Sequence, residues 1–131
     1  MANTETNTRS SSTQKSKLVT NAATGLSGSA VVVLDSVDAT AYERASIQII
    51  NASEGATITA KVFGSLVDAA GTVGGSNWTQ IGDDISITND TSAMKSIATT
   101  GLRKLGVTMS IASGTPTFNA GNCLMFLQGT I

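Results

Sequence analysis

The sequence has no histidine and only one cysteine among its 131 residues. Without histidine there is no Ser-His-Asp or Cys-His catalytic machinery, no imidazole base and no usual zinc site. A single cysteine cannot form an internal disulfide, and Cys123 lies in an apolar run, where a cysteine packs as a small hydrophobic residue. The phosphate-binding motifs GxxxxGK[ST] and GxGxxG are also missing. We therefore expect a protein that is not an enzyme and that holds no cofactor and no metal.

Charged and aromatic residues are both scarce. Charged residues make up 13% of the chain, about half of the roughly 25% that is usual in soluble domains, and aromatic residues make up 4%. The net charge of −1 excludes a generally basic nucleic-acid-binding protein, because binding to phosphates needs clustered lysine and arginine. A surface so poor in charge is typical of a protein that buries much of itself against neighbours, and a β-domain with a Ser/Thr-rich face explains it equally well. We expect a homo-oligomer, with a trimer favoured.

Long hydrophobic runs are absent too. The longest, Ala30–Leu34 and Cys123–Leu127, are far too short to cross a bilayer, so we expect no membrane partner. Residues 1–17 contain no apolar stretch of the kind found in secretory signals, which predicts a protein made in the cytoplasm.

Short apolar runs with turn residues between them fill the rest of the chain. Alternation with a period of two predicts strands, and no segment shows a sustained helical period with caps. The expected strands cover residues 28–35, 42–50, 56–63, 77–81, 85–88, 93–99, 105–111 and 123–128. The fold predicted is all-β, an antiparallel β-sandwich or jelly roll of seven to eight strands with an extended N-terminal arm.

Two local features refine this prediction. Residues 42–50 and 56–63 are joined by the turn sequence Asn51–Gly55, which predicts that the two strands pair as a hairpin. Residues 91–105 are the best helical alternative, weakened by Gly101 and by adjacent β-branched threonines.

The N-terminal segment is polar and slightly basic. Residues 1–24 are expected to form an extended arm, and residues 25–131 the sandwich domain. Residues 1–17 contain almost nothing apolar, so a neighbouring subunit would have to order them. Arg9, Lys15 and Lys17 would then meet acidic residues of a partner, and attachment would weaken as the salt concentration rises.

Three further features are candidates for contact or binding. Trp78, the only tryptophan, is expected to anchor a core or an interface rather than to stack on a sugar. Arg103 and Lys104 are adjacent on an expected strand, so at least one of them faces outward. Asp68, Asp83 and Asp84 lie in turn-rich segments and are expected to be solvated. A calcium site drawing on these carboxylates is the alternative.

Three nearby segments carry a resemblance to known proteins: Lys61–Ser65 (KVFGS), Ser76–Ile81 (SNWTQI) and Gly82–Ile85 (GDDI). Together they resemble the pattern V-x-G-S-x-D-G-x-x-W-x-x-I-G of β-sandwich proteins in tailed-phage particles. A similar pattern occurs in discoidin-like, sugar-binding jelly rolls. In this sequence the loop Leu66–Gly75 replaces the tight Asp-Gly turn of the pattern.

The wider profile is similar to that of phage head decoration (cement) proteins, which share the small size, the Ser/Thr/Gly-rich strands and the polar arm. The resemblance implies a structural protein on the outer surface of a virion, with the major capsid protein or other virion subunits as partners. The alternatives are a carbohydrate-binding module or a β-sandwich module of the tail or neck.

Overall fold

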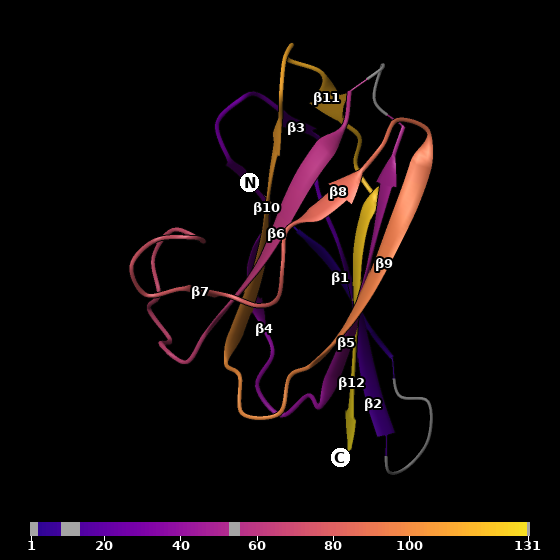
Figure 1. Ribbon diagram of the computed structural model, residues 1–131. Helices are drawn as coiled ribbons and strands as arrows, with labels where there is room; N and C mark the ends of the chain where they lie inside the picture. Colours follow the sequence, from indigo (N-terminus) through magenta and orange to yellow (C-terminus); the bar gives the residue numbers. More distant parts are fainter. Residues whose placement is uncertain (1–2, 9–13, 53–55, 131) are drawn as a thin grey trace.

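The computed structural model describes residues 3–8, 14–52 and 56–130, and every regular element among them is a β-strand (Figure 1). None of the described residues belongs to a helix that could cross a membrane. The strands are β1 (Thr4–Thr8), β2 (Gln14–Thr20), β3 (Thr24–Gly25), β4 (Val31–Asp38), β5 (Arg44–Asn51), β6 (Ile58–Ser65), β7 (Thr79–Gln80), β8 (Ile85–Ile87), β9 (Thr91–Ala98), β10 (Lys104–Ile111), β11 (Thr117–Phe118) and β12 (Cys123–Thr130). The all-β prediction is confirmed, and the helical alternative at residues 91–105 gives way to β9 and the start of β10.

Eight of these strands form a jelly roll. One sheet has the order β1-β2-β12-β5-β9, and the other has the order β4-β10-β6 with β7 and β8 both paired to β6. Without β1, the first sheet is β2-β12-β5-β9 and it faces β4-β10-β6-β8. In chain order these eight strands pass repeatedly from one sheet to the other, which gives the two antiparallel sheets of a jelly roll. The predicted sandwich of seven to eight main strands is therefore confirmed.

The core lies between the two sheets and is made almost entirely of aliphatic residues. Alternate residues of β5, β6 and β12 point inward, as a period of two requires. The fully buried side chains include Leu34, Ile47, Ile49, Ile58, Leu105, Met109, Met125 and Leu127. A sequence poor in aromatic residues thus fills its core with Val, Ile, Leu and Met.

The N-terminal segment joins the sandwich as two strands. β1 pairs antiparallel with β2, with Thr4 opposite Thr20 at one end and Thr8 opposite Ser16 at the other. β2 in turn pairs with β12. We expected residues 1–24 to form an extended arm, whereas residues 4–8 and 14–20 are strands of the five-stranded sheet. A polar segment can pair in this way because the backbone ladder supplies the hydrogen bonds, and Val19 is the one apolar residue of β1 and β2 that belongs to the core.

The hairpin predicted from the turn sequence Asn51–Gly55 is wrong. The strands on either side of that turn lie in different sheets: β5 pairs with β12 and β9, whereas β6 pairs with β10, β7 and β8. Both strands bury alternate residues, and the buried residues of each strand pack against the opposite sheet. A short turn between two alternating strands is compatible with a crossing between sheets as well as with a hairpin.

The long loop between β6 and β7 packs onto the outer face of the sheet that contains β4, β10 and β6. It is the segment that stands away from the five-stranded sheet in Figure 1. Ala70, Val73 and Trp78 form a second small core there, against Val32 and Phe63. This explains the tryptophan of the pattern, since Trp78 is 7% exposed and fastens the loop to the sheet.

Gly106 lets the loop approach β10. A Cβ atom at this position would lie 2.5 Å from Cγ1 of Val73, which is closer than two carbon atoms can pack. We expect Gly106→Ala to destabilise the protein by about 1–3 kcal/mol, the usual cost of overpacking. Urea unfolding followed by the fluorescence of Trp78 measures this loss.

The same clash supplies a rescue experiment. Val73→Ala removes the two methyl groups that the new Cβ would meet, so the double variant should recover part of the stability lost by Gly106→Ala. Gly25→Ala is the matched control, because a Cβ there would meet no atom within 4 Å. A Gly106→Ala protein as stable as the unchanged protein would contradict this account.

Candidate interaction surface

The outer face of the five-stranded sheet carries almost no charge. The strand register brings the outward residues of β2, β12, β5 and β9 onto one face. These residues are Gln14, Ser16, Leu18, Thr20, Arg44, Ser46, Gln48, Ile50, Ser92, Met94, Ser96, Ala98, Leu124, Phe126, Gln128 and Thr130. Arg44, at the beginning of β5, is the only charged residue of this set. We call this set the uncharged face.

The centre of the uncharged face is apolar. Met94 is 68% exposed and Phe126 is 37% exposed. A shallow hollow of about 170 Å³ lies between them, lined also by Leu18, Leu124 and Gln48. Exposed apolar side chains gathered within a face that carries a single charge at its end are typical of an interaction site.

This surface escaped the sequence analysis because both sides of β12 are apolar. In the sequence, residues 123–127 form one unbroken apolar run that shows no alternation. A signal was nevertheless present: Leu124 and Phe126 are out of phase with the core residues Cys123, Met125 and Leu127. Separating the two phases of β5, β9 and β12 would have shown that their outward residues are almost all uncharged, while only the pairing of the strands brings these residues onto one face.

Two of the predicted contact residues meet over a tyrosine ring. The ammonium groups of Lys15 and Lys17 lie 4.5 Å and 5.2 Å from the centre of the Tyr42 ring. Burial, together with the negative charge of Glu5, raises the pKa of Tyr42. Lys17 is only 5% exposed, and its Nζ donates a hydrogen bond of 2.8 Å to the carbonyl oxygen of Asp38. The ammonium group of Lys17 is therefore bound within this chain and is not free to meet a partner. Arg9, the third basic residue of the expected arm, lies outside the described residues.

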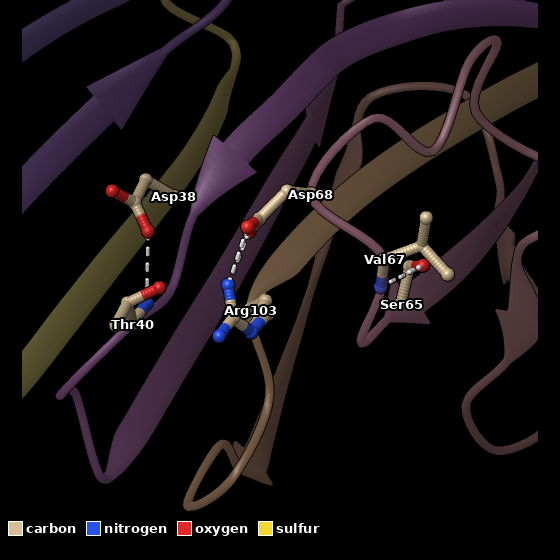
Figure 2. A network of polar contacts seen from close by, with 6 residues as sticks. All are labelled: Asp38, Thr40, Ser65, Val67, Asp68 and Arg103. Atoms are coloured by element: carbon tan, nitrogen blue, oxygen red, sulfur yellow. Dashed lines mark hydrogen bonds and ion pairs between the residues drawn. The ribbon is translucent and has the colours of Figure 1, made fainter.

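Lys104 lies opposite Asp38 in the ladder between β10 and β4. The backbone N–H of Thr40 donates a hydrogen bond of 2.9 Å to Asp38 Oδ1, as Figure 2 shows. This backbone hydrogen bond is the main reason why the pKa of Asp38 is lowered, with smaller contributions from the charges of Lys104 and Lys17. Lys104 is half-buried and keeps part of its surface available to a partner.

Arg103 and Trp78 both fasten the long loop. Figure 2 shows the guanidinium group of Arg103 directed at the carboxylate of Asp68, with which it forms an ion pair. Ser65 Oγ donates a hydrogen bond to the carbonyl oxygen of Asn77 and accepts one from the backbone N–H of Val67. The Arg103 pair is exposed to solvent, so it adds little to stability and serves mainly to position the loop.

The carboxylates considered for calcium do not converge. Asp68 is held by Arg103, while Asp84 accepts a hydrogen bond from Gln80 Nε2 and lies 3.7 Å from Lys61 Nζ. Within the described ranges, no three Asp, Glu or Cys side chains are grouped in a way that could hold a metal ion. The calcium alternative has no geometric support there.

Comparisons with known proteins agree with the fold. No protein-family model and no curated protein matches the sequence. A solved structure from work on Bacillus endospore appendages, described as disulfide-linked pili, matches 98% of this chain and 91% of its own chain, with 17% identity and a TM-score of 0.54. A structure of infectious bursal disease virus matches 97% of this chain and 33% of its own, with 12% identity and a TM-score of 0.42. A family 11 carbohydrate-binding module of Clostridium thermocellum matches 99% of this chain and 82% of its own, with 8% identity and a TM-score of 0.31.

At such low identity, the first of these likenesses shows a shared fold and nothing about function. The chain is a β-sandwich module of the jelly-roll type. What it binds has to be argued from its own surface.

Proposed function

We propose that this chain is a non-enzymatic structural subunit of a phage particle, an accessory protein that decorates the outside of the head. The observation that carries the proposal is the uncharged face, which extends over four strands. The resemblance of the segments around Trp78 to β-sandwich proteins of tailed-phage particles supports the choice of particle. The major capsid protein is the expected partner.

The chemistry of the uncharged face suits a permanent protein contact. Charged residues are depleted in the cores of interfaces because their desolvation costs free energy. Ser46, Gln48 and Ser96 can exchange hydrogen bonds with a partner, while Phe126 and Met94 bury apolar area. Attachment through this face should depend little on salt concentration, in contrast to attachment through a basic arm.

The thiol of this chain is not available at the surface. Cys123 is 0% exposed, in a strand with neighbours on both sides. The Bacillus appendages are described as disulfide-linked pili. A linkage of that kind through Cys123 would require β12 to leave the sheet, so we propose that this chain assembles without covalent bonds.

The test uses shells assembled from the major capsid protein of the same phage. Phe126→Lys places a charge at the centre of the uncharged face, and we expect binding in a co-sedimentation assay to fall at least about tenfold. Leu66→Lys is the matched control, because Leu66 is 65% exposed and lies on the loop over the other sheet. Circular dichroism verifies that both variants are folded.

Two results would overturn the proposal. In the first, the folded protein stays in the supernatant when the shells are pelleted; in the second, the Phe126→Lys protein binds as well as the control. Binding to purified tails or necks instead of shells would move the protein to that part of the particle. The carbohydrate-binding alternative predicts signals on a glycan array. It has little support in the structure, since Trp78 is buried and Tyr42 is covered by two lysines.

A further inference from the structure

The edges of the two sheets differ in how well they are protected. An unprotected edge strand offers free backbone groups to another chain, and natural proteins usually make such strands short, irregular or covered. β7 and β8 are two and three residues long, and β1 has five residues. These three edges are short.

The edge of β4 is covered and irregular. The side chain of Asn3 acts as a small partner strand: its Nδ2 donates to the carbonyl oxygen of Asp35, and its Oδ1 accepts from the N–H of the same residue. Ser36 has a positive φ of 44°, and the ladder between β4 and β10 contains register shifts. Another strand could not pair along this edge without displacing Asn3.

β9 is neither short, irregular nor covered by described residues, and its single charged residue, Lys95, is the one edge-protecting feature that it carries. It has eight residues, pairs with β5 over its whole length without a register shift, and contains one charged residue, Lys95. Lys95 extends toward Gly82, away from the uncharged face. In the part of the chain that the structure describes, β5 is the only strand paired with β9.

The ladder shows which backbone groups of β9 are directed outward. Just beyond β9, the N–H of Thr99 donates to the carbonyl oxygen of Glu43, which lies next to Arg44 at the beginning of β5. In an antiparallel ladder, alternate residues bond to the same neighbour. The N–H and C=O groups of Ala93, Lys95 and Ile97 therefore point to β5, and those of Ser92, Met94, Ser96 and Ala98 point to the open edge.

We propose that β9 pairs with β9 of a second copy of this chain, antiparallel, around a twofold axis at Met94. Outward-pointing residues must lie opposite one another, and two of the registers that allow this keep the two strands paired over nearly their whole length: Met94 opposite its own copy, or Met94 opposite Ser96. The second register places Lys95 directly opposite Lys95, and like charges in that position are destabilising. The first register places Lys95 opposite Ala93, so charge selects it.

The dimer joins two five-stranded sheets into one ten-stranded sheet. The uncharged faces of the two copies then form one surface, and the two Met94 side chains meet beside the hollow of each copy. The pairing is isologous and closes after two copies. It predicts a dimer where the sequence favoured a trimer. It does not rest on the proposed attachment to a phage head, because a dimer that does not bind shells would support this inference and overturn that proposal.

Ser96→Pro tests the edge directly. Proline removes the outward N–H of this residue without removing a backbone hydrogen bond to β5. The side-chain hydrogen bond between Ser96 Oγ and Ser46 Oγ is lost in Ser96→Ala as well, so that variant controls for it. We expect light scattering at tens of micromolar to give about twice 13.3 kDa for the unchanged chain and for Ser96→Ala, and 13.3 kDa for Ser96→Pro. Circular dichroism establishes that the proline variant is folded.

Met94→Lys provides a second route if the proline variant does not fold. It sets two ammonium groups against each other on the axis while leaving every backbone group in place, so it should also give a monomer. For the register, Met94→Cys should be cross-linked to a dimer by a short bismaleimide, whereas the exposed Leu66→Cys control should not. A monomeric unchanged chain, a dimer that survives both substitutions, or a trimer that depends on β9 would overturn the inference.

Discussion

Iodoacetamide is expected to react with Cys123 in the folded protein at least about a thousandfold more slowly than with an exposed thiol. Burial raises the pKa of the Cys123 thiol from 9.0 to about 12. The thiolate is the reactive form, and each pKa unit lowers its fraction about tenfold at a pH below the pKa, so three units give about a thousandfold. The fully buried side chain adds a steric barrier. Mass spectrometry after timed labelling at pH 8 measures the rate.

Leu66→Cys supplies the comparison within the same molecule, because residue 66 is exposed. Its thiol should be labelled quickly while Cys123 remains unmodified, and urea should make both thiols reactive. Equal labelling rates in the folded protein would contradict the buried position of β12. They would also reopen the possibility of subunits joined through this cysteine.

Asn51→Asp is expected to destabilise the protein by about 3–5 kcal/mol, the usual cost of leaving a buried charge without a partner. Asn51 is 1% exposed at the end of β5, where the chain crosses to the other sheet. Its Nδ2 donates hydrogen bonds of 2.7 Å to the carbonyl oxygen of Ala56 and 2.8 Å to that of Ile87. A carboxylate of the same shape cannot donate and faces those two oxygens instead. Urea or thermal unfolding measures the change.

The stability lost in Asn51→Asp should partly return at acidic pH. Burial beside two carbonyl oxygens raises the pKa of the introduced carboxyl above its value in the unfolded chain. A raised pKa means that the folded state is favoured at low pH and loses stability as the pH rises. Asn119→Asp, at an exposed position, is the control and should change little. If both variants were equally stable, Asn51 would not be the link between the sheets.

The signals that located the strands are local. Alternation at residues 44–51, 58–65 and 104–111 reflects the period of two along a single strand, so it survives without any knowledge of the partner strand. The same holds for Cys123, whose apolar neighbours predict burial. The absence of histidine and the scarcity of charge are likewise properties of the chain before it folds.

Other features depended on which strands meet. β5 and β6 each have a correct pattern, but only the closure of two sheets decides that they lie in opposite layers. The polar residues 4–8 and 14–20 have little apolar pattern, and they become strands because β12 offers β2 an edge with which to pair. Lys17 was expected at a partner and is instead held by Asp38 and Glu5, which come from other strands.

The sequence by itself thus determined the fold class, the main strands and the aliphatic core, because burial of alternate residues is written along each strand. The tertiary structure decided the jelly-roll order, the uncharged face and the open edge of β9. These depend on pairings between residues far apart in the chain. The outward-pointing residues of each strand are not constrained by packing in the core. Which surface they form together depends on the strands that lie beside them in the sheet.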